Sequence, residues 1–146
     1  MPSSESEGWA YLTNRFGVER EDLENYDLVE NSGDIWLITE SYEEFDDLDF
    51  ETLGIRFLRI TGRGLKPTTY GLQIIGDELE KNVIDVDRDE LSKLLAREEM
   101  IPRDLEEEGY VAIRYEEQII GCGYYMDDVV SSRIPKGRSK ELLQII

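Results

Sequence analysis

Apolar side chains recur at helical spacing near the start of the chain and then alternate with polar ones, as in strands. Residues 9–16 carry the helical pattern, and Gly17 provides the expected stop because glycine tolerates the left-handed conformation at a helix end. Residues 26–39 alternate on both sides of an Asn-Ser-Gly-Asp segment and predict a β-hairpin. The acidic residues 40–51 predict a connector, and we place a domain boundary at its end.

After the connector, the pattern alternates between strand and helix. A strand is predicted at residues 54–60, followed by a glycine-rich turn. Pro67 and the threonines after it predict a helix start, and the leucines and isoleucines that follow share one helical face. A short strand at 83–86 precedes a second helix, which begins at the capping box of Asp87 and Glu90.

Residues 109–132 predict three consecutive strands, the first two joined by a tight turn. Gly121 and Gly123 interrupt the second strand, where glycine usually marks a bulge or a close approach of two backbones. A basic segment follows, which we interpret as an exit strand. The whole order predicts an α+β fold, with a small N-terminal α/β subdomain at 1–52 and a mixed β-barrel with covering helices at 53–146.

The amino-acid composition excludes several kinds of catalytic and metal site. The 146 residues include no histidine, which excludes a Ser-His-Asp triad, a Cys-His nucleophile and His-ligated zinc. The single cysteine, Cys122, excludes an internal disulfide and fits a reducing cytoplasm. No apolar run is long enough for a membrane span, and the first residues lack the pattern of a secretory signal. We therefore expect a cytoplasmic, non-catalytic protein with no metal site, no cofactor and no membrane contact.

The net charge is −18, and the acids are unevenly placed. Residues 1–55 contain 16 acids and 2 bases, so most of the negative charge lies in the N-terminal part. Such acidity fits a protein from a halophilic archaeon, because carboxylate surfaces keep proteins hydrated in a salty cytoplasm. An ordinary acidic mesophilic protein is the alternative, and both explanations stay open.

Two stretches reverse the sign of this charge. Residues 56–66 and 129–140 together hold eight cations and no acid. If both stretches meet on one face, their side chains form a patch for phosphate groups, assisted by backbone N–H groups at a helix start. The alternative is that these cations lie at solvated strand edges and pair with nearby acids. The residues predicted to make this nucleic-acid contact are Arg56, Arg59, Arg63, Lys66, Thr68, Arg133, Lys136 and Arg138.

Three other features are candidate sites. Cys122 lies in an apolar strand, where a lone thiol is more often a small buried side chain than a nucleophile. The acidic cluster at 43–49 does not fit an EF-hand loop and is interpreted as a solvated charge run. Tyr124 and Tyr125 are adjacent in a strand, so one of them must face away from the core. An outward ring beside cations can stack on a nucleobase.

A resemblance to a known family rests on an ordered set of segments. These segments are Leu65-Lys-Pro-Thr-Thr, Lys81-Asn-Val-Ile-Asp-Val-Asp, Gly109-Tyr-Val-Ala-Ile-Arg-Tyr, Ile120-Gly-Cys-Gly-Tyr and Ile134-Pro-Lys-Gly-Arg. Together they resemble the PUA-like RNA-binding C-terminal domain of Sun/RsmF-type rRNA cytosine-C5 methyltransferases. The resemblance depends mostly on the order of four features: a strand, the Gly-x-Gly motif, a further strand and the Pro-Lys-Gly motif.

The resemblance implies an RNA-binding protein without the catalyst. The chain has no room for a methyltransferase domain, so we expect it to bind structured rRNA or tRNA in connection with RNA modification or ribosome biogenesis. A methyltransferase or a ribosomal protein is the expected protein partner. The alternative is an acidic protein–protein adaptor that docks a basic ribosomal or methyltransferase partner through residues 43–49.

Overall fold

The computed structural model describes residues 3–39, 54–62, 64–96 and 99–145. The described chain forms two compact units, Met1–Lys81 and Asn82–Ile146. The acidic connector, its cluster at 43–49 and the expected boundary at 52/53 lie outside the described residues.

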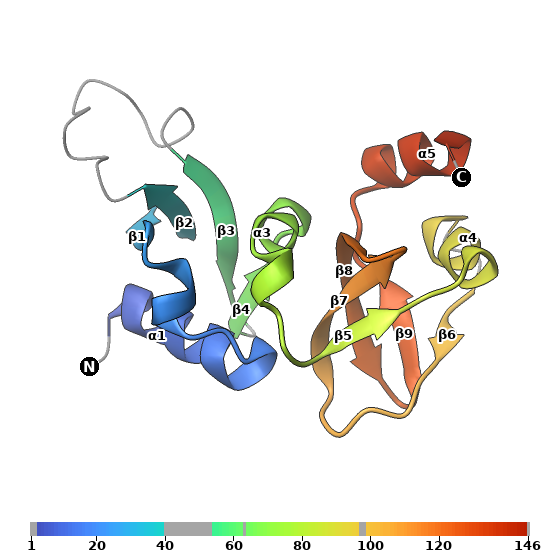
Figure 1. The fold of residues 1–146 in the computed structure, drawn as a ribbon, viewed down its shortest axis with the longest axis horizontal. Coiled ribbons are helices and arrows are strands. Elements are labelled where there is room, and N and C mark those ends of the chain that lie inside the picture. Colours follow the sequence, from blue (N-terminus) through green and yellow to red (C-terminus); the bar gives the residue numbers. More distant parts are fainter. Residues whose placement is uncertain (1–2, 40–53, 63, 97–98, 146) are drawn as a thin grey trace. The chain divides into compact units, whose positions relative to one another are not determined.

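The first unit contains a four-stranded antiparallel sheet in the order β1-β2-β3-β4 (Figure 1). The expected helix and hairpin are confirmed, and Gly17 ends the helical segment with a φ of 70°. The strands β3 and β4 had been expected in the second domain, but β3 pairs with β2 and so completes this sheet. The elements of this unit are α1 Ser4–Tyr11, a π-helical turn Leu12–Phe16, a 3₁₀ turn Arg20–Leu23, β1 Tyr26–Asn31, β2 Asp34–Thr39, β3 Gly54–Thr61, β4 Gly64–Pro67, α3 Thr69–Ile74 and a 3₁₀ turn Gly76–Glu78.

The expected helix start at Pro67 is wrong by two residues. Pro67 ends the edge strand β4, opposite Leu58, and Thr68 is the N-cap of α3. An edge strand accepts proline because one side of it has no neighbouring strand to receive an N–H group. The helix that follows lies close to β3, since a Cβ on Gly71 would collide with the Phe57 ring.

The second unit contains a curled five-stranded sheet in the order β5-β7-β8-β9-β6 (Figure 1). Strand β5 runs parallel to β7, and the other pairs are antiparallel, so the sheet is mixed as expected. The elements are β5 Val83–Asp85, α4 Arg88–Ala96, β6 Ile101–Pro102, β7 Gly109–Tyr115, β8 Gln118–Met126, β9 Val129–Ser132 and α5 Lys136–Ile145.

Helix α4 covers one face of this sheet and closes its core. Its buried leucines pack with apolar side chains from β5, β7, β8 and β9. The capping box is confirmed, because Asp87 Oδ1 accepts from the Glu90 N–H and Glu90 Oε1 accepts from the Asp87 N–H. The core residues of the second unit are Ile84, Val86, Leu91, Leu94, Leu95, Ile101, Val111, Ile113, Tyr125, Val130, Ile134 and Leu142.

The basic exit segment is a helix, not the strand that we expected. Pro135 precedes α5, and its carbonyl accepts a hydrogen bond from the Ser139 N–H at 2.9 Å. Leu142 then reaches the core of the second unit, while Ser139 is also buried. The apolar positions of this segment follow a helical rather than an alternating period, and Leu142 on this period reaches the core.

The hairpin β7–β8 turns through two acidic residues in the left-handed region. Glu116 and Glu117 have φ values of 49° and 69°, and Tyr115 pairs with Gln118 across them. Positive φ at both central positions defines a type I′ turn, which favours asparagine followed by glycine. A left-handed conformation costs other L-residues about 1 kcal/mol each. The two glutamates therefore destabilise this turn relative to the asparagine and glycine that it favours.

Replacing Glu116 by Asn together with Glu117 by Gly should stabilise the protein. We expect the free energy of unfolding to rise by about 1 kcal/mol, measured by urea denaturation, because the new pair suits the turn. Glu106→Asn with Glu107→Gly is a control that removes the same charges outside a hairpin turn. An equal gain in that control would show that charge removal, rather than turn geometry, is responsible.

Candidate functional site

The two adjacent tyrosines of β8 face opposite sides of the sheet. Tyr125 is 3% exposed and belongs to the core, so Tyr124 lies on the other face. On that face the ring of Tyr110, its cross-strand partner, meets the Tyr124 ring edge-on at a centroid distance of 4.9 Å. The expectation that one of the two packs in the core is confirmed.

Arg133 lies over the Tyr124 ring. Its guanidinium carbon is 5.5 Å from the ring centroid, within the range of a cation–π interaction. The Arg133 N–H donates to the Cys122 carbonyl at 2.8 Å, which fixes the backbone beside β8. No ion pair joins this guanidinium to a carboxylate in the part of the chain that the structure describes. We call Tyr110, Tyr124 and Arg133 the tyrosine–arginine face.

The sheet brings β8 and β9 close together beneath this face. A Cβ on Gly123 would lie 2.9 Å from Val130 Cγ1 and 3.0 Å from the Ser131 carbonyl oxygen. Only glycine fits such a gap without movement of a neighbour. The predicted close approach at this glycine is therefore present, and it sets the position of the strand that leads to Arg133.

A second arginine, at the start of the loop between β6 and β7, connects this loop to α4 and β5. Arg103 donates through Nη1 to Glu90 Oε2 at 2.6 Å and through Nη2 to Glu90 Oε1 at 2.9 Å. It also donates to the backbone carbonyls of Asp85 and Pro102. The hydrogen bond from Arg103 lowers the pKa of the Glu90 carboxyl, and the same bond raises the pKa of Arg103. This arginine supports the fold rather than a ligand site.

Arg114 is occupied in a similar way. Its Nε and Nη2 donate to the two carboxylate oxygens of Asp85 at 2.6 and 2.9 Å. This bidentate hydrogen bond lowers the pKa of Asp85. The pair joins the neighbouring strands β5 and β7, so Arg114 is held by an acid on its own sheet.

In the first unit, two of the predicted RNA-binding arginines are also paired. Arg56 Nε lies 2.8 Å from Asp34 Oδ2, and Arg59 Nε lies 3.5 Å from Asp34 Oδ1. Arg56 further lies over the Trp36 ring, 5.5 Å from its centroid. One buried aspartate thus holds both guanidinium groups, as the alternative interpretation of these residues proposed.

Thr68 is engaged as well. Its hydroxyl donates to the Arg56 carbonyl at 2.7 Å and accepts from the Gly71 N–H at 3.0 Å. Because a hydroxyl has one proton, Thr68 cannot donate to a phosphate while this bond persists. Lys66 on β4 makes no ion pair with a described carboxylate, and Arg63 lies outside the described residues.

The remaining predicted cations belong to α5 in the second unit. Arg138 lies 3.3 Å from Glu141 along the helix, whereas Lys136 is exposed and has no carboxylate partner among the described residues. The eight predicted residues therefore divide between the two units, five in the first and three in the second. Their convergence on one face stays a prediction.

The mixed curled sheet with its covering helices has the architecture of a PUA-like domain. Residues 81–139 match the family described as the methyltransferase RsmF PUA domain. This part of the chain is therefore similar to a PUA domain of the Sun/RsmF type, and the expected resemblance and α+β fold are confirmed. No curated protein matches the sequence.

Other site classes receive no support from the described residues. Among them, no three acidic or cysteine side chains are grouped so that they could hold a metal ion. None of the described helices is long and apolar enough to cross a membrane. Cys122 is buried, and its thiol donates to the neighbouring Gly123 carbonyl at 3.6 Å.

The sequence interpretation missed Tyr110. A bulge between Ile113 and Arg114 shifts the β7–β8 register by one residue, so Tyr110 lies opposite Tyr124. Counting back from the two-residue turn without a bulge would instead place Tyr110 opposite Gly123. The glycine interruption of β8 is the one sequence signal for such an irregularity.

Acidification should remove the stabilisation that Glu90 provides. Its pKa is lowered in the folded state, so its contribution is complete above the usual carboxyl pKa of 4.5 and is lost as pH falls through the folded value. We expect Glu90→Gln to cost about 1–2 kcal/mol at pH 7 and progressively less below pH 4.5. Urea unfolding across this range, with exposed Glu106→Gln as control, measures the difference. A penalty independent of pH would contradict the role of the ion pair.

Gly123→Ala should destabilise the second unit. The added methyl group meets Val130 and the Ser131 carbonyl, so we expect a loss of about 1–3 kcal/mol in the free energy of unfolding. Gly137→Ala on α5 is the matched control, because nothing lies within 4 Å of its added Cβ. Equal stability of the two variants would show that β8 and β9 do not meet so closely.

Proposed function

We propose that this chain is a non-catalytic RNA-binding protein that engages structured rRNA or tRNA in connection with RNA modification or ribosome biogenesis. The PUA domain supports RNA as the class of ligand. One observation carries the choice of contact residues: the Arg133 guanidinium lies on Tyr124 and has no described carboxylate partner. The tyrosine–arginine face is the proposed contact surface.

A planar guanidinium held on a tyrosine is suited to stacking. An arginine presents a flat cation whose outer side can receive a nucleobase, while its N–H groups remain available to phosphate or to base edges. The Tyr124 ring contacts the guanidinium through a cation–π interaction, and the Tyr110 ring packs edge-on against the Tyr124 ring. The side chain is therefore partly ordered before RNA arrives, which lowers the entropy lost on binding.

Stacking also suits a chain of such negative charge. Phosphate attraction weakens steeply as salt rises, whereas base stacking depends less on charge. At molar salt the screening length is about 3 Å, so remote carboxylates scarcely repel an RNA held at a local face. If the protein comes from a salty cytoplasm, as expected, base stacking on Arg133 would contribute more to RNA binding than phosphate contacts by many cations.

Lys66 and Lys136 remain proposed phosphate contacts. Both lack carboxylate partners in the described chain, in contrast to Arg56, Arg59 and Arg138. We further propose that a methyltransferase or a ribosomal protein acts with this chain, since the matched domain carries the name of a methyltransferase.

Substitution of Arg133 tests the proposal. We expect Arg133→Gln to weaken binding of rRNA fragments by about 5- to 150-fold, because loss of a stacked base costs about 1–3 kcal/mol. Fluorescence anisotropy at several salt concentrations measures both the affinity and its salt dependence. A stacking role predicts a large loss of affinity with little change in the slope against salt concentration.

The control is Arg88→Gln, which removes the same charge from α4. Helix α4 packs on the core face of the sheet, opposite the face that carries Tyr124. Equal weakening in both variants would indicate general attraction and would contradict the assignment to Arg133. Absence of RNA binding by the unaltered chain, across salt concentrations, would overturn the proposed function itself.

A further inference from the structure

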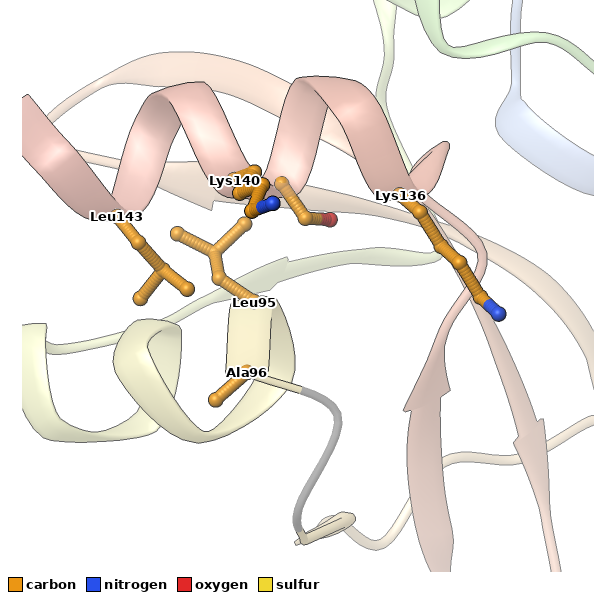
Figure 2. A pocket seen from close by; sticks show the side chains of 6 residues that line it. Leu95, Ala96, Lys136, Lys140 and Leu143 are labelled. Atoms are coloured by element: carbon orange, nitrogen blue, oxygen red, sulfur yellow. The ribbon is translucent and has the colours of Figure 1, made fainter.

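A pocket of about 320 Å³ lies between α4 and α5, and its lining includes no residue of the tyrosine–arginine face (Figure 2). Leu95 and Ala96 of α4 and Leu143 of α5 give it an apolar lining. Figure 2 shows Leu95 and Leu143 pointing toward one another across the gap, with Lys140 above them and Lys136 at one end. The lining therefore has an apolar part and a cationic rim.

The rim of this pocket is positively charged, although the chain as a whole has a net charge of −18. Lys136 and Lys140 stand four residues apart on α5, so they share one side of the helix. The described residues that line the pocket include these two lysines and no acid. Neither lysine makes an ion pair with a described carboxylate, whereas Lys93 on α4 pairs with Glu99 at 3.7 Å. The positive charge of Lys136 and Lys140 would therefore attract an anionic group of a ligand.

Ser139 adds an independent sign of a ligand. It lines the same pocket, is 3% exposed, and its hydroxyl has no hydrogen-bond partner among the described residues. A buried hydroxyl without a partner is unfavourable, and an acceptor oxygen brought by a ligand would satisfy it. The hydroxyl lies on the same helix as both ammonium groups, one residue before Lys140.

We propose that this pocket binds one nucleoside monophosphate unit, either free or as the phosphorylated end of an RNA strand. Its phosphate would lie between Lys136 and Lys140 and accept from the Ser139 hydroxyl, while the base and ribose cover Leu95, Ala96 and Leu143. The volume is at the lower end of the range for ligand pockets and suits one nucleotide rather than a longer segment. The RNA source of this unit rests on the proposed function.

The first experiment titrates the full chain with cytidine monophosphate, cytidine and inorganic phosphate, followed by backbone NMR shifts. We expect the monophosphate to move the signals of Leu95, Ala96 and residues 136–143, with much smaller effects from the other two. Equal effects of nucleoside and nucleotide would overturn the phosphate contact. Equal effects of inorganic phosphate and nucleotide would overturn the apolar contact, and no shift at all would overturn the site.

Ser139→Ala separates a ligand role from a structural one. Because the hydroxyl has no partner to lose, we expect the melting temperature to stay the same or rise, while nucleotide affinity falls about 5-fold. Lys140→Gln should weaken the nucleotide further, by about 10-fold. Lys93→Gln, on α4 but outside the pocket lining, is the control and should leave the affinity unchanged. Unchanged affinity in Ser139→Ala and Lys140→Gln would overturn the proposal.

A second titration distinguishes the sources. Short RNA strands with a phosphorylated end should bind more tightly than the same strands with hydroxyl ends, and Lys140→Gln should abolish that difference. RNA binding at Tyr124 without any response of the pocket to RNA or nucleotide would overturn the pocket and leave the proposed function intact. Binding of the free nucleotide without any RNA binding would overturn the proposed function and leave a mononucleotide site.

Discussion

The anchoring of Tyr125 in the core determines most of what the second unit presents to its surroundings. Its ring is buried, and its hydroxyl accepts from the Leu105 N–H at 3.1 Å and donates to Asp128 at 3.2 Å. These two bonds connect the loop before β7, the middle of the sheet and the β8–β9 turn. Since side chains alternate along a strand, a fixed Tyr125 leaves Tyr124 on the opposite face. The location of Arg133 follows from the same strand pairing.

Much of this arrangement could be predicted from local pattern, and the rest depends on irregularities that pattern does not encode. The adjacent tyrosines required one inward and one outward ring, and the leucines of α4 marked its buried side correctly. The bulge at Ile113, in contrast, depends on how β7 and β8 fit together, and a shift of one residue changes every pair beyond it. The assignment of β3 also needed tertiary information, because its pairing partner lies across the acidic connector. For α5, the apolar positions have a helical period, but four cations between residues 133 and 140 dominate the sequence pattern.

Acidic residues also decide which cations remain available. With 34 acids against 16 bases, most of the arginines that the structure describes pair with a carboxylate in their own unit, as Arg56, Arg103 and Arg114 do. Such arginines contribute to folding, and their count says little about ligand binding. The informative cations in such a chain are those that lack a carboxylate partner, and Arg133, Lys136 and Lys140 are in this group within the described residues. The tyrosine–arginine face and the α4–α5 pocket are built around them.

The burial of Cys122 gives this molecule an internal reporter of its own motions. The only sulfhydryl in the sequence is 1% exposed and lies in β8, the central strand of the five-stranded sheet. A thiol reagent can reach it only when the strands around it separate, so the rate of modification measures the frequency of that opening. Ligands that hold the sheet closed would slow the reaction without any label being introduced. The rate of opening of the sheet can therefore be measured in the chain without any substitution.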